Sequence, residues 1–339
     1  MASEFVVNGR FAGRRLTGVE RYGSEILRGL GTRVNVIKPR RTLTGLRGHL
    51  WEQVVLPRML GQDAFLWSPA NTGPLTVTQQ AVTIHDLSVL EHPEWFNSNF
   101  RLWYTFLLPR LARRARIVLT VSEHSRRSIL LKFRLPDEKV VVVHDGVNMQ
   151  QFHPCDAAAV RAKYGLGRQY ILFVGSLDPR KNLERLLQSL MLLSDIPNIE
   201  LVIAGSWSNI FRPVSMNRSK RRTRLLGYVP DEDLPGLYSG ATLFIMPSMY
   251  EGFGLSVLEA MACGTPVISS HAGALPEVVG DAAMQIDPTS VEGMAEAMRT
   301  VLLQDSVRDE LRRKGLERAC LFSWERSAEQ VWEVLSANA

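Results

Sequence analysis

The stretch YEGFGLSVLEAMACGTPVISS, residues 250–270, combines a glycine loop with the start of an apolar helix. It follows an apolar run at 243–246 that predicts a strand, and the glycines at positions 252 and 254 place a turn before the helix. A helix beginning here directs unpaired backbone N–H groups and the positive end of its dipole at the loop. The sequence therefore predicts a strand–loop–helix unit that can bind a phosphate.

Two glutamates in this stretch need separate explanations. Glu251 lies in the loop, where it would repel a bare phosphate. It fits beside sugar hydroxyls or a developing positive charge, and the alternative is an acid that stabilises the helix start. Glu259 lies between Leu258 and Ala260 on a helix with almost no polar face. A carboxylate in that setting needs either a ligand or a buried partner.

A second strand–loop–helix unit occurs at YILFVGSLDPRKN, residues 170–182. Its loop carries Arg180 and Lys181 just before a helix that we expect at 183–193. Cations at the start of a helix oppose its dipole, which favours an anionic partner such as a phosphate over two solvated basic side chains.

Apolar runs and amphipathic stretches alternate along the whole chain. Strands are expected at residues 33–37, 81–84, 117–121, 140–143, 171–174, 201–204, 243–246 and 267–269. Helices are expected at residues 19–30, 97–114, 123–133, 183–193, 254–261, 291–304 and 306–320. This pattern predicts an α/β protein with parallel sheets covered on both faces.

An unpatterned stretch at residues 148–154 separates two such blocks. A chain of 339 residues is also long enough for two domains. We expect one domain at residues 1–155 and a second at 156–323, each a doubly wound sheet. The two would face each other across a cleft lined by the carboxyl ends of the strands.

Composition narrows the class of protein. The chain is 45% hydrophobic and 22% charged, as in ordinary globular proteins. Cys155, Cys263 and Cys320 are too few and scattered for a disulfide framework or a zinc site, and no apolar run is long enough to span a membrane. We therefore expect a cytoplasmic protein. The net charge of +6 divides into +9 over residues 1–155 and −3 over 156–339, so phosphorylated ligands, anionic membranes and nucleic acids all fit the charge.

Other patterns indicate different chemistry. The string Asp231-Glu232-Asp233 could bind a metal, but its position before LPGLY favours the first, capped turn of a helix. No G-x-G-x-x-G follows a strand, which argues against a dehydrogenase. The basic stretch at 211–224 is expected to be a solvated loop between strands, with an anion-contacting loop as the weaker alternative. No metal-ligand spacing is found among His49, His92, His124, His144, His153 and His271.

EGFGLSVLEAMACGTPVI resembles the E-x7-E motif of the family 4 retaining glycosyltransferases with the GT-B fold, and GSLDPRKNLERLL resembles that family's pyrophosphate loop. Further matches follow in the family's order: TGVERY at 17–22, TIHDLSVLEHPEWF at 83–96, VSEHSRRSI at 121–129, VVHDGVN at 142–148, GYVPDEDLPGLYSGA at 227–241, GALPEVVGDAA at 273–283 and FSWERSA at 322–328. The resemblance implies two Rossmann-like domains and a C-terminal helix, at about 324–339, that packs back on the first.

The resemblance also implies roles for individual residues. Arg180 and Lys181 would bind the donor diphosphate, Glu259 the ribose hydroxyls, and Glu251 would face the donor sugar. Further donor contacts would come from Gly18, Ser176, Gly252, Phe253, Gly254 and Leu255, and the sugar and acceptor side would comprise His85, Asp86 and Ser122. The catalytic residues would be His85, Glu251, Arg180 and Lys181, without metal or cofactor. Ser256 replaces a common proline, and Gly18 replaces a glycine pair, which leaves the first loop's geometry open.

The implied reaction moves a hexose, with retention, from a nucleoside diphosphate to a saccharide or polyprenyl-linked saccharide in bacterial polysaccharide synthesis. The motifs look most like those of bacterial polysaccharide mannosyltransferases, so GDP-mannose is the expected donor, ahead of UDP- and dTDP-sugars. We expect front-face attack, with a covalent intermediate on Glu251 as the alternative. A nucleotide-sugar epimerase or a phosphorylase on the same fold is the alternative function. A nucleic-acid-binding protein is disfavoured because no aromatic-basic module is present.

Basic clusters at residues 40–41, 110–116 and 126–127 lie in the first domain, which binds the acceptor in this family. The cluster at 110–116 follows a helix rich in aromatic residues. It is either a core helix that ends in solvated arginines or a docking surface for an anionic membrane, and the sequence favours neither. Docking would place the protein on the inner face of the cytoplasmic membrane.

Overall fold

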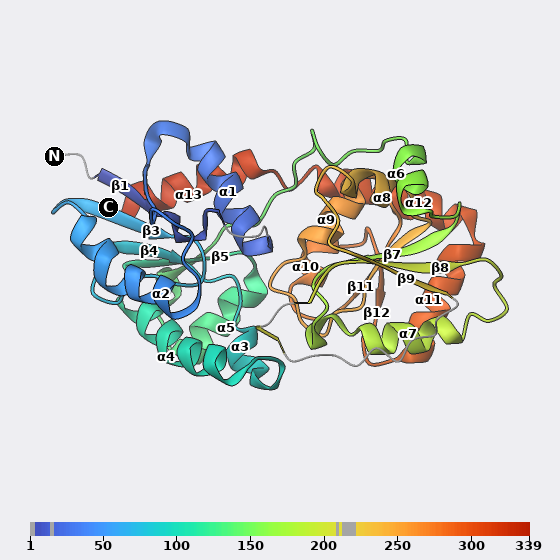
Figure 1. The fold of residues 1–339 in the computed structure, drawn as a ribbon, viewed down its shortest axis with the longest axis horizontal. Helices are drawn as coiled ribbons and strands as arrows, with labels where there is room; N and C mark the ends of the chain where they lie inside the picture. Colours follow the sequence, from blue (N-terminus) through green and yellow to red (C-terminus); the bar gives the residue numbers. More distant parts are fainter. Residues whose placement is uncertain (1–3, 14–16, 208–209, 212–221) are drawn as a thin grey trace. The chain divides into compact units, whose positions relative to one another are not determined.

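The computed structural model describes residues 4–13, 17–207, 210–211 and 222–339. The chain divides into two compact units (Figure 1). Unit 1 comprises Met1–Glu91, Ser98–Gly146 and Trp324–Ala339, and unit 2 comprises His92–Asn97 and Val147–Ser323. The division thus falls after Gly146 rather than at residue 155 as expected, and the last helix belongs to unit 1.

Unit 1 is built on a six-stranded parallel sheet in the order β2-β1-β3-β4-β5-β6. Its strands are β1 (Glu4–Asn8), β2 (Asn35–Ile37), β3 (Ala64–Ser68), β4 (Gln80–Thr83), β5 (Ile117–Thr120) and β6 (Val140–Val142). Strands β3, β4 and β5 are buried along their whole length, as expected of parallel strands covered on both faces.

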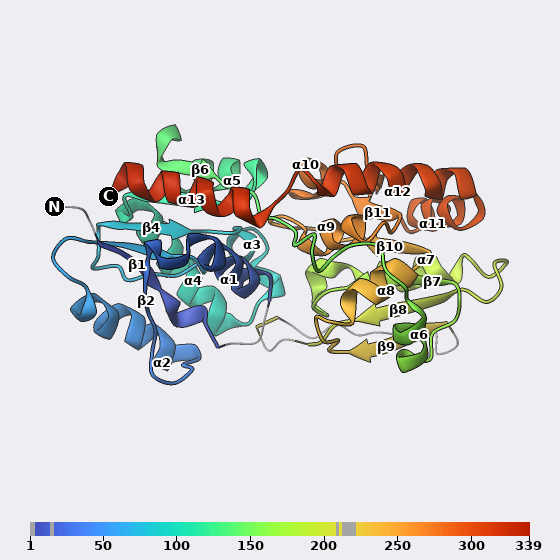
Figure 2. The ribbon, with the colours of Figure 1, turned by 90° about the horizontal axis from the view of Figure 1, so that it is seen from above.

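The helices of unit 1 cover both faces of this sheet, with α1 and α13 on one and α4 and α5 on the other (Figures 1 and 2). They are α1 (Gly18–Leu30), α2 (Gly45–Leu50), α3 (Ser88–Glu91), α4 (Ser98–Arg114), α5 (Glu123–Phe133) and α13 (Trp324–Asn338). Helix α13 packs closely on α1, since a Cβ at Gly29 would lie 2.4 Å from the Cβ of Ala328. Phe5 of β1 also contacts Trp332 of α13, with ring centroids 4.8 Å apart.

Unit 2 contains a second six-stranded parallel sheet, in the order β12-β11-β10-β7-β8-β9. Its strands are β7 (Tyr170–Val174), β8 (Glu200–Ala204), β9 (Thr223–Gly227), β10 (Leu243–Met246), β11 (Val267–Ser270) and β12 (Met284–Ile286). Its helices are α6 (Ala158–Tyr164), α7 (Leu183–Met191), α8 (Leu234–Gly240), α9 (Leu255–Ala262), α10 (Leu275–Val279), α11 (Val291–Leu303) and α12 (Asp305–Ala319). The predicted α/β class with parallel sheets is confirmed.

Each sheet has a point where the strand order reverses, which is where α/β proteins bind ligands. In unit 2 this point lies between β7 and β10, and in unit 1 it lies between β1 and β3. The loops after these four strands are therefore the expected positions of ligand-binding residues.

Segment His92–Asn97 is part of unit 2 although the chain on both sides of it belongs to unit 1. The Asn97 N–H donates to the carbonyl of Ile210 at 2.9 Å, and Phe96 forms an antiparallel bridge with Phe211. Sequence reasoning placed this segment in the first domain. Residues 212–221 of the basic stretch expected as a solvated loop lie outside the described residues.

All predicted strands are present, with small shifts at their ends, but β1, β3, β9 and β12 are not predicted by the pattern. The helical run at residues 45–59 is also unpredicted. It consists of α2, the π-helical turn η3 (Trp51–Val55) and the 3-10 turn η4 (Leu56–Met59). Its glycines and proline are residues typical of loops.

Candidate active site

The loops after β7 and β10 meet at the strand reversal of unit 2. The backbone N–H of Met249 donates to the carbonyl of Arg180 at 2.8 Å. Asn182, in the left-handed region with φ 59°, donates from its side chain to the carbonyls of Pro247 (3.0 Å) and Pro288 (2.7 Å). The bond between Met249 and Arg180 and the bond from Asn182 to Pro247 join the two loops that sequence reasoning selected separately, and the bond to Pro288 adds the loop after β12.

The loop after β7 is organised by Asp178, a residue that sequence reasoning missed. Its buried carboxylate accepts from the Ser176 hydroxyl at 2.5 Å and from the Arg180 N–H at 3.1 Å, and the second bond caps the 3-10 turn η7 (Pro179–Lys181). The Arg180 Nε also lies 3.6 Å from this carboxylate. The signal was an Asp-Pro pair at a helix entry, which is a frequent cap. Ser176, expected to touch the donor, bonds to Asp178.

Lys181 and Glu251 form a buried ion pair across the two loops. Lys181 Nζ lies 2.6 Å from Glu251 Oε1, and each side chain is 8% exposed. The Ser248 hydroxyl donates to the same oxygen at 2.7 Å. Burial alone would raise the pKa of Glu251, but Lys181 and Arg180 outweigh it and hold this pKa below its ordinary value. Glu251 is therefore ionised at neutral pH.

The backbone around Glu251 is held just as closely. The Glu251 carbonyl accepts from the Ala274 N–H at 2.9 Å. Gly273 has φ 62°, and a Cβ there would lie 2.5 Å from the Glu251 carbonyl oxygen. Gly252 and buried Phe253 continue the loop to Gly254, the residue before α9, and Leu255 begins the helix as predicted within one residue.

Glu259 has a buried protein partner. The hydroxyl of Tyr238, a fully buried residue of α8, donates to Glu259 Oε2 at 2.9 Å. Burial and the nearby Glu259 raise the pKa of Tyr238 well above its ordinary value, so the phenol remains a donor. Sequence reasoning left a ligand and a buried partner as alternatives, and the structure supplies the partner. The ribose-binding role of Glu259 stays a prediction.

His85 follows β4 in unit 1 and is held at three atoms. Its N–H donates to Asn71 Oδ1 (2.7 Å), its carbonyl accepts from the Ser125 hydroxyl (2.9 Å), and its Nε2 lies 2.9 Å from the Pro69 carbonyl. A carbonyl only accepts, so Nε2 carries the proton. Burial lowers the pKa of His85, although Pro69 and Asp86 oppose this, so the ring is neutral with Nδ1 as its acceptor.

The other expected residues of unit 1 have local structural roles. Asp86 accepts from the N–H (2.8 Å) and the hydroxyl (2.6 Å) of Ser88 at the start of α3. The Ser122 hydroxyl accepts from the Ser125 N–H at 3.1 Å and caps α5. Gly18 is the first residue of α1 rather than a loop residue. Nothing in these contacts tests a role in binding.

Among the described residues, no group of three or more His, Cys, Asp or Glu side chains is found that could hold a metal ion, at the D-x-D string or elsewhere. Asp233 precedes α8 but does not cap it with its side chain, which corrects the expectation. Its carboxylate accepts instead from Lys163 and Tyr164, each at 2.6 Å. These two donors lower the pKa of Asp233.

Two family models match the chain. Residues 157–336 match "Glycosyl transferases group 1", and residues 17–151 match "Glycosyltransferase Family 4". The O-antigen chain mannosyltransferase B of Escherichia coli is 36% identical over 305 residues, which cover 87% of this chain and 77% of that protein. The serotype-specific mannosyltransferase WbdA of Escherichia coli is 29% identical over 261 residues, but these span only 32% of its length. The comparisons give no support to an epimerase or a phosphorylase.

A solved structure shares the fold. Anabaena Alr3699/HepE, in complex with UDP-glucose, superposes with a TM-score of 0.78 and covers 99% of this chain and 100% of its own. The sequences are 18% identical, so this likeness concerns the fold alone.

Proposed function

Because the chain belongs to the group 1 and family 4 glycosyltransferases, we propose that it transfers mannose from GDP-mannose to a saccharide or polyprenyl-linked saccharide in bacterial polysaccharide synthesis. The mannosyltransferase names of its relatives support mannose as the sugar. The observation that carries the proposal is the meeting of the β7 and β10 loops at the strand reversal, with Arg180, Lys181 and Glu251 on them.

The two cations stabilise the leaving nucleoside diphosphate. Negative charge grows on this group as the bond to the anomeric carbon breaks, so Arg180 and Lys181 bind the transition state more tightly than the ground state. An ammonium has three N–H donors, and Lys181 directs one of them to Glu251. The remaining donors serve the diphosphate, and the reaction proceeds without a metal.

Glu251 orients Lys181 and faces the sugar rather than attacking it. Its Oε1 accepts from both Lys181 and Ser248, and these bonds reduce the nucleophilicity of the carboxylate. This supports front-face attack with retention, in which the acceptor's proton passes to the departing phosphate. Neutral His85 contributes a hydrogen bond to the transferred sugar.

A donor screen tests this proposal. Purified protein is incubated with GDP-mannose, UDP-glucose and a dTDP-sugar, with and without EDTA, and nucleoside diphosphate release is measured. We expect release from GDP-mannose that EDTA leaves unchanged, and an α-linked product by NMR when acceptor is added. Release from another sugar nucleotide alone would overturn the donor, and a β-linked product would overturn retention.

One surface of unit 1 supports association with an anionic membrane. No acidic residue occurs between Glu25 and Glu52 or between Glu94 and Glu123. The run at 45–59 exposes Leu46, Leu50, Val54 and Met59, and α4 exposes Leu102 and Phe106. His49 joins the two helices, with its ring centroid 4.7 Å from that of Trp103. Exposed arginines occur within these segments or close to them in the sequence, at positions 40, 41, 47, 58, 101, 110, 113 and 114.

We propose that this surface docks on anionic phospholipid and brings the enzyme to a lipid-linked acceptor. No helix in the described parts of the chain is long and apolar enough to cross a bilayer. Apolar side chains that enter the interface and arginines that face the headgroups give the usual two contributions to peripheral binding.

Vesicle flotation tests the docking surface. We expect binding to vesicles that contain phosphatidylglycerol, weaker binding to phosphatidylcholine alone, and loss of binding in Leu46→Ser/Leu50→Ser. Leu131→Ser is the matched control, because Leu131 is a highly exposed leucine of α5 outside the surface. Equal flotation of both variants would contradict the assignment.

A further inference from the structure

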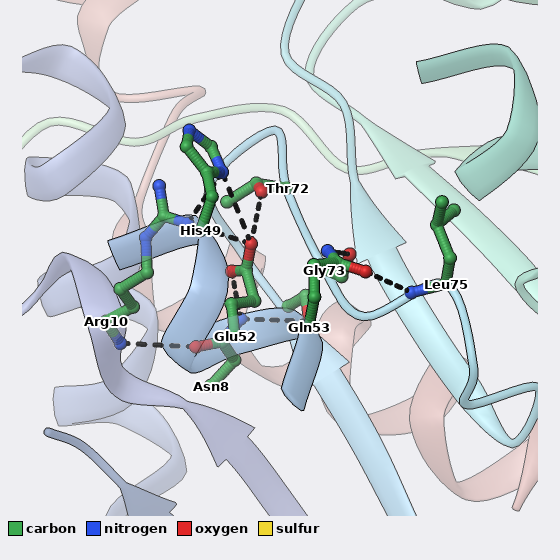
Figure 3. Close-up of polar contacts among 9 residues, drawn as sticks. Asn8, Arg10, His49, Glu52, Gln53, Thr72, Gly73 and Leu75 are labelled. Carbon is green, nitrogen blue, oxygen red and sulfur yellow. Dashed lines mark hydrogen bonds and ion pairs between the residues drawn. The ribbon is translucent and has the colours of Figure 1, made fainter. Parts of the chain in front are cut away.

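A fully buried carboxylate, Glu52, spans the strand reversal of unit 1 (Figure 3). Its Oε1 accepts from the Asn8 side chain at 2.7 Å, and its Oε2 accepts from Arg10 Nη1 at 2.9 Å. The Thr72 hydroxyl also donates to Oε2. Asn8 is the last residue of β1 and Arg10 lies just after the strand, whereas Thr72 lies after β3, so one side chain joins the two segments at the reversal.

The charge of Glu52 is balanced inside the protein. Arg10 is almost fully buried beside it, and the same Nη1 donates to His49 Nδ1 at 2.9 Å. An arginine only donates, so His49 Nδ1 is the acceptor of this bond. Arg10 thus places a cation beside the buried carboxylate, and the carboxylate in turn holds Thr72.

Gln53, the next residue, holds the same loop at a second point. Its Nε2 donates to the Gly73 carbonyl at 2.7 Å, and its Oε1 accepts from the Leu75 N–H at 2.9 Å. Glu52 and Gln53 lie on the π-helical turn η3, a rare conformation that is frequent at functional sites. Two consecutive side chains thus reach the same loop.

The loop that they hold carries the partners of His85. Asn71, with φ 58°, accepts from the His85 N–H and donates its own N–H to the Thr83 carbonyl at 3.1 Å. The Pro69 carbonyl is the acceptor that places the proton on His85 Nε2. Thr72 and Gly73 follow Asn71 directly, so a shift of either moves both partners of His85.

We propose that Glu52 and Gln53 are positioning residues, which hold loop 69–73 so that the His85 ring keeps its proton on Nε2 and presents Nδ1 as an acceptor. This inference rests on the proposed function only for the use of His85 at the sugar. The fixed ring state itself is a property of the free protein.

The ¹⁵N chemical shifts of the histidine ring in the full-length protein test the proposal without any substrate. In the wild type we expect one His85 form, with an unprotonated Nδ1 and a protonated Nε2, assigned by its absence in His85→Gln. Thr72→Val and Gln53→Leu each remove the loop contact without stranding Arg10, and both should show a mixture of the two neutral forms. Gln79→Leu is the control, because Gln79 is exposed and its side chain bonds to Arg116 rather than to loop 69–73.

Kinetics give an independent measure. We expect kcat for nucleoside diphosphate release to fall about 10-fold to 100-fold in Thr72→Val and Gln53→Leu, as for a catalytic group displaced by about 1 Å. The donor KM should change little, and the melting temperature should stay near that of Gln79→Leu. An unchanged His85 spectrum and unchanged kcat in folded variants would overturn the proposal. A wild type that shows the single ring form but uses no sugar nucleotide would instead overturn the proposed function.

Discussion

Lys181 and Glu251 lie 70 residues apart in sequence, and their charged atoms are 2.6 Å apart in the structure. Each residue comes from a different loop at the strand reversal of unit 2. The pair therefore forms only when those two loops are correctly assembled. Substitutions at these two residues can separate an effect on folding from an effect on catalysis.

Replacing Lys181 alone leaves an ionised carboxylate buried without its cation. Lys181→Met should destabilise the protein by about 3–5 kcal/mol in urea unfolding. The reason is that removing one member of a buried ion pair costs more stability than replacing both members. The double variant Lys181→Met/Glu251→Gln should recover much of this loss. Both variants should lose about 10²-fold or more in nucleoside diphosphate release. Full activity in either would contradict the phosphate-binding assignment of Lys181.

Asp145 should make the stability of the folded protein decrease as pH rises. Burial raises its pKa well above the ordinary value, and its Oδ1 has no hydrogen-bond partner among the described residues. The folded protein thus retains a proton that the unfolded chain releases near pH 3.9, about the reference value, so the stabilising contribution is present below that pH and is lost as pH rises towards the folded-state pKa.

Asp145→Asn removes this titration. Urea unfolding at pH 5, 7 and 9 should show the wild type losing stability relative to Asp145→Asn as pH rises, by up to about 1.4 kcal/mol per pH unit. Parallel pH profiles for the two proteins would show that Asp145 is ionised in the fold.

The Tyr238 hydroxyl should matter through Glu259. Tyr238→Phe removes one hydrogen bond to a buried carboxylate, and we expect a loss of about 1.5–3 kcal/mol in stability. If Glu259 binds the ribose, the KM for the donor should rise more than kcat falls. Tyr228→Phe serves as control, because Tyr228 is 56% exposed. An unchanged donor KM in a folded Tyr238→Phe protein would contradict the ribose-binding role of Glu259.

Gly273 should tolerate no side chain. A Cβ would lie 2.5 Å from the Glu251 carbonyl oxygen, so Gly273→Ala must displace the backbone that carries Glu251. Gly165→Ala is the matched control, since Gly165 is in the left-handed region with nearly the same φ (63° against 62°), and its Cβ would meet only an ordinary contact, Arg224 Nη1 at 3.5 Å. Gly165→Ala should cost about 1–2 kcal/mol, the usual left-handed penalty, and Gly273→Ala more, with loss of activity. Equal losses of stability and activity in the two variants would show that backbone strain alone is responsible, without a contribution from the clash at Glu251.

The parallel α/β fold and the two phosphate loops could be predicted because local signals carry them. Continuous apolar strands, glycines before helices and cations at a helix entry are all visible within about a dozen residues. Strand β3, AFLWS, is not predicted because it contains no β-branched residue, although it lies at the centre of its sheet.

The partners within the site could not be predicted because they depend on the packing of distant segments. Tyr238 meets Glu259 only once α8 packs against α9. Nothing in the sequence around Glu52 indicates that its side chain is buried. Glu52 lies on a π-helical turn that the local sequence pattern does not predict. The Asp-Pro pair indicates that Asp178 caps the turn that follows it, but nothing in the sequence predicts the hydrogen bond between Asp178 and Ser176.

The packing of α13 on α1 sets the order in which the protein can be completed during synthesis. Trp324, Ala328 and Trp332 contact Tyr22, Gly29 and Phe5, so the half of the protein that the ribosome makes first lacks part of its own interior until the last helix has emerged. Unit 2, whose segments all precede Trp324, is available to fold earlier. In the nascent chain, unit 1 therefore stays incomplete while unit 2 folds. A chain truncated before α13 loses the packing of that helix on α1 and β1, so the truncation also affects the N-terminal part of unit 1.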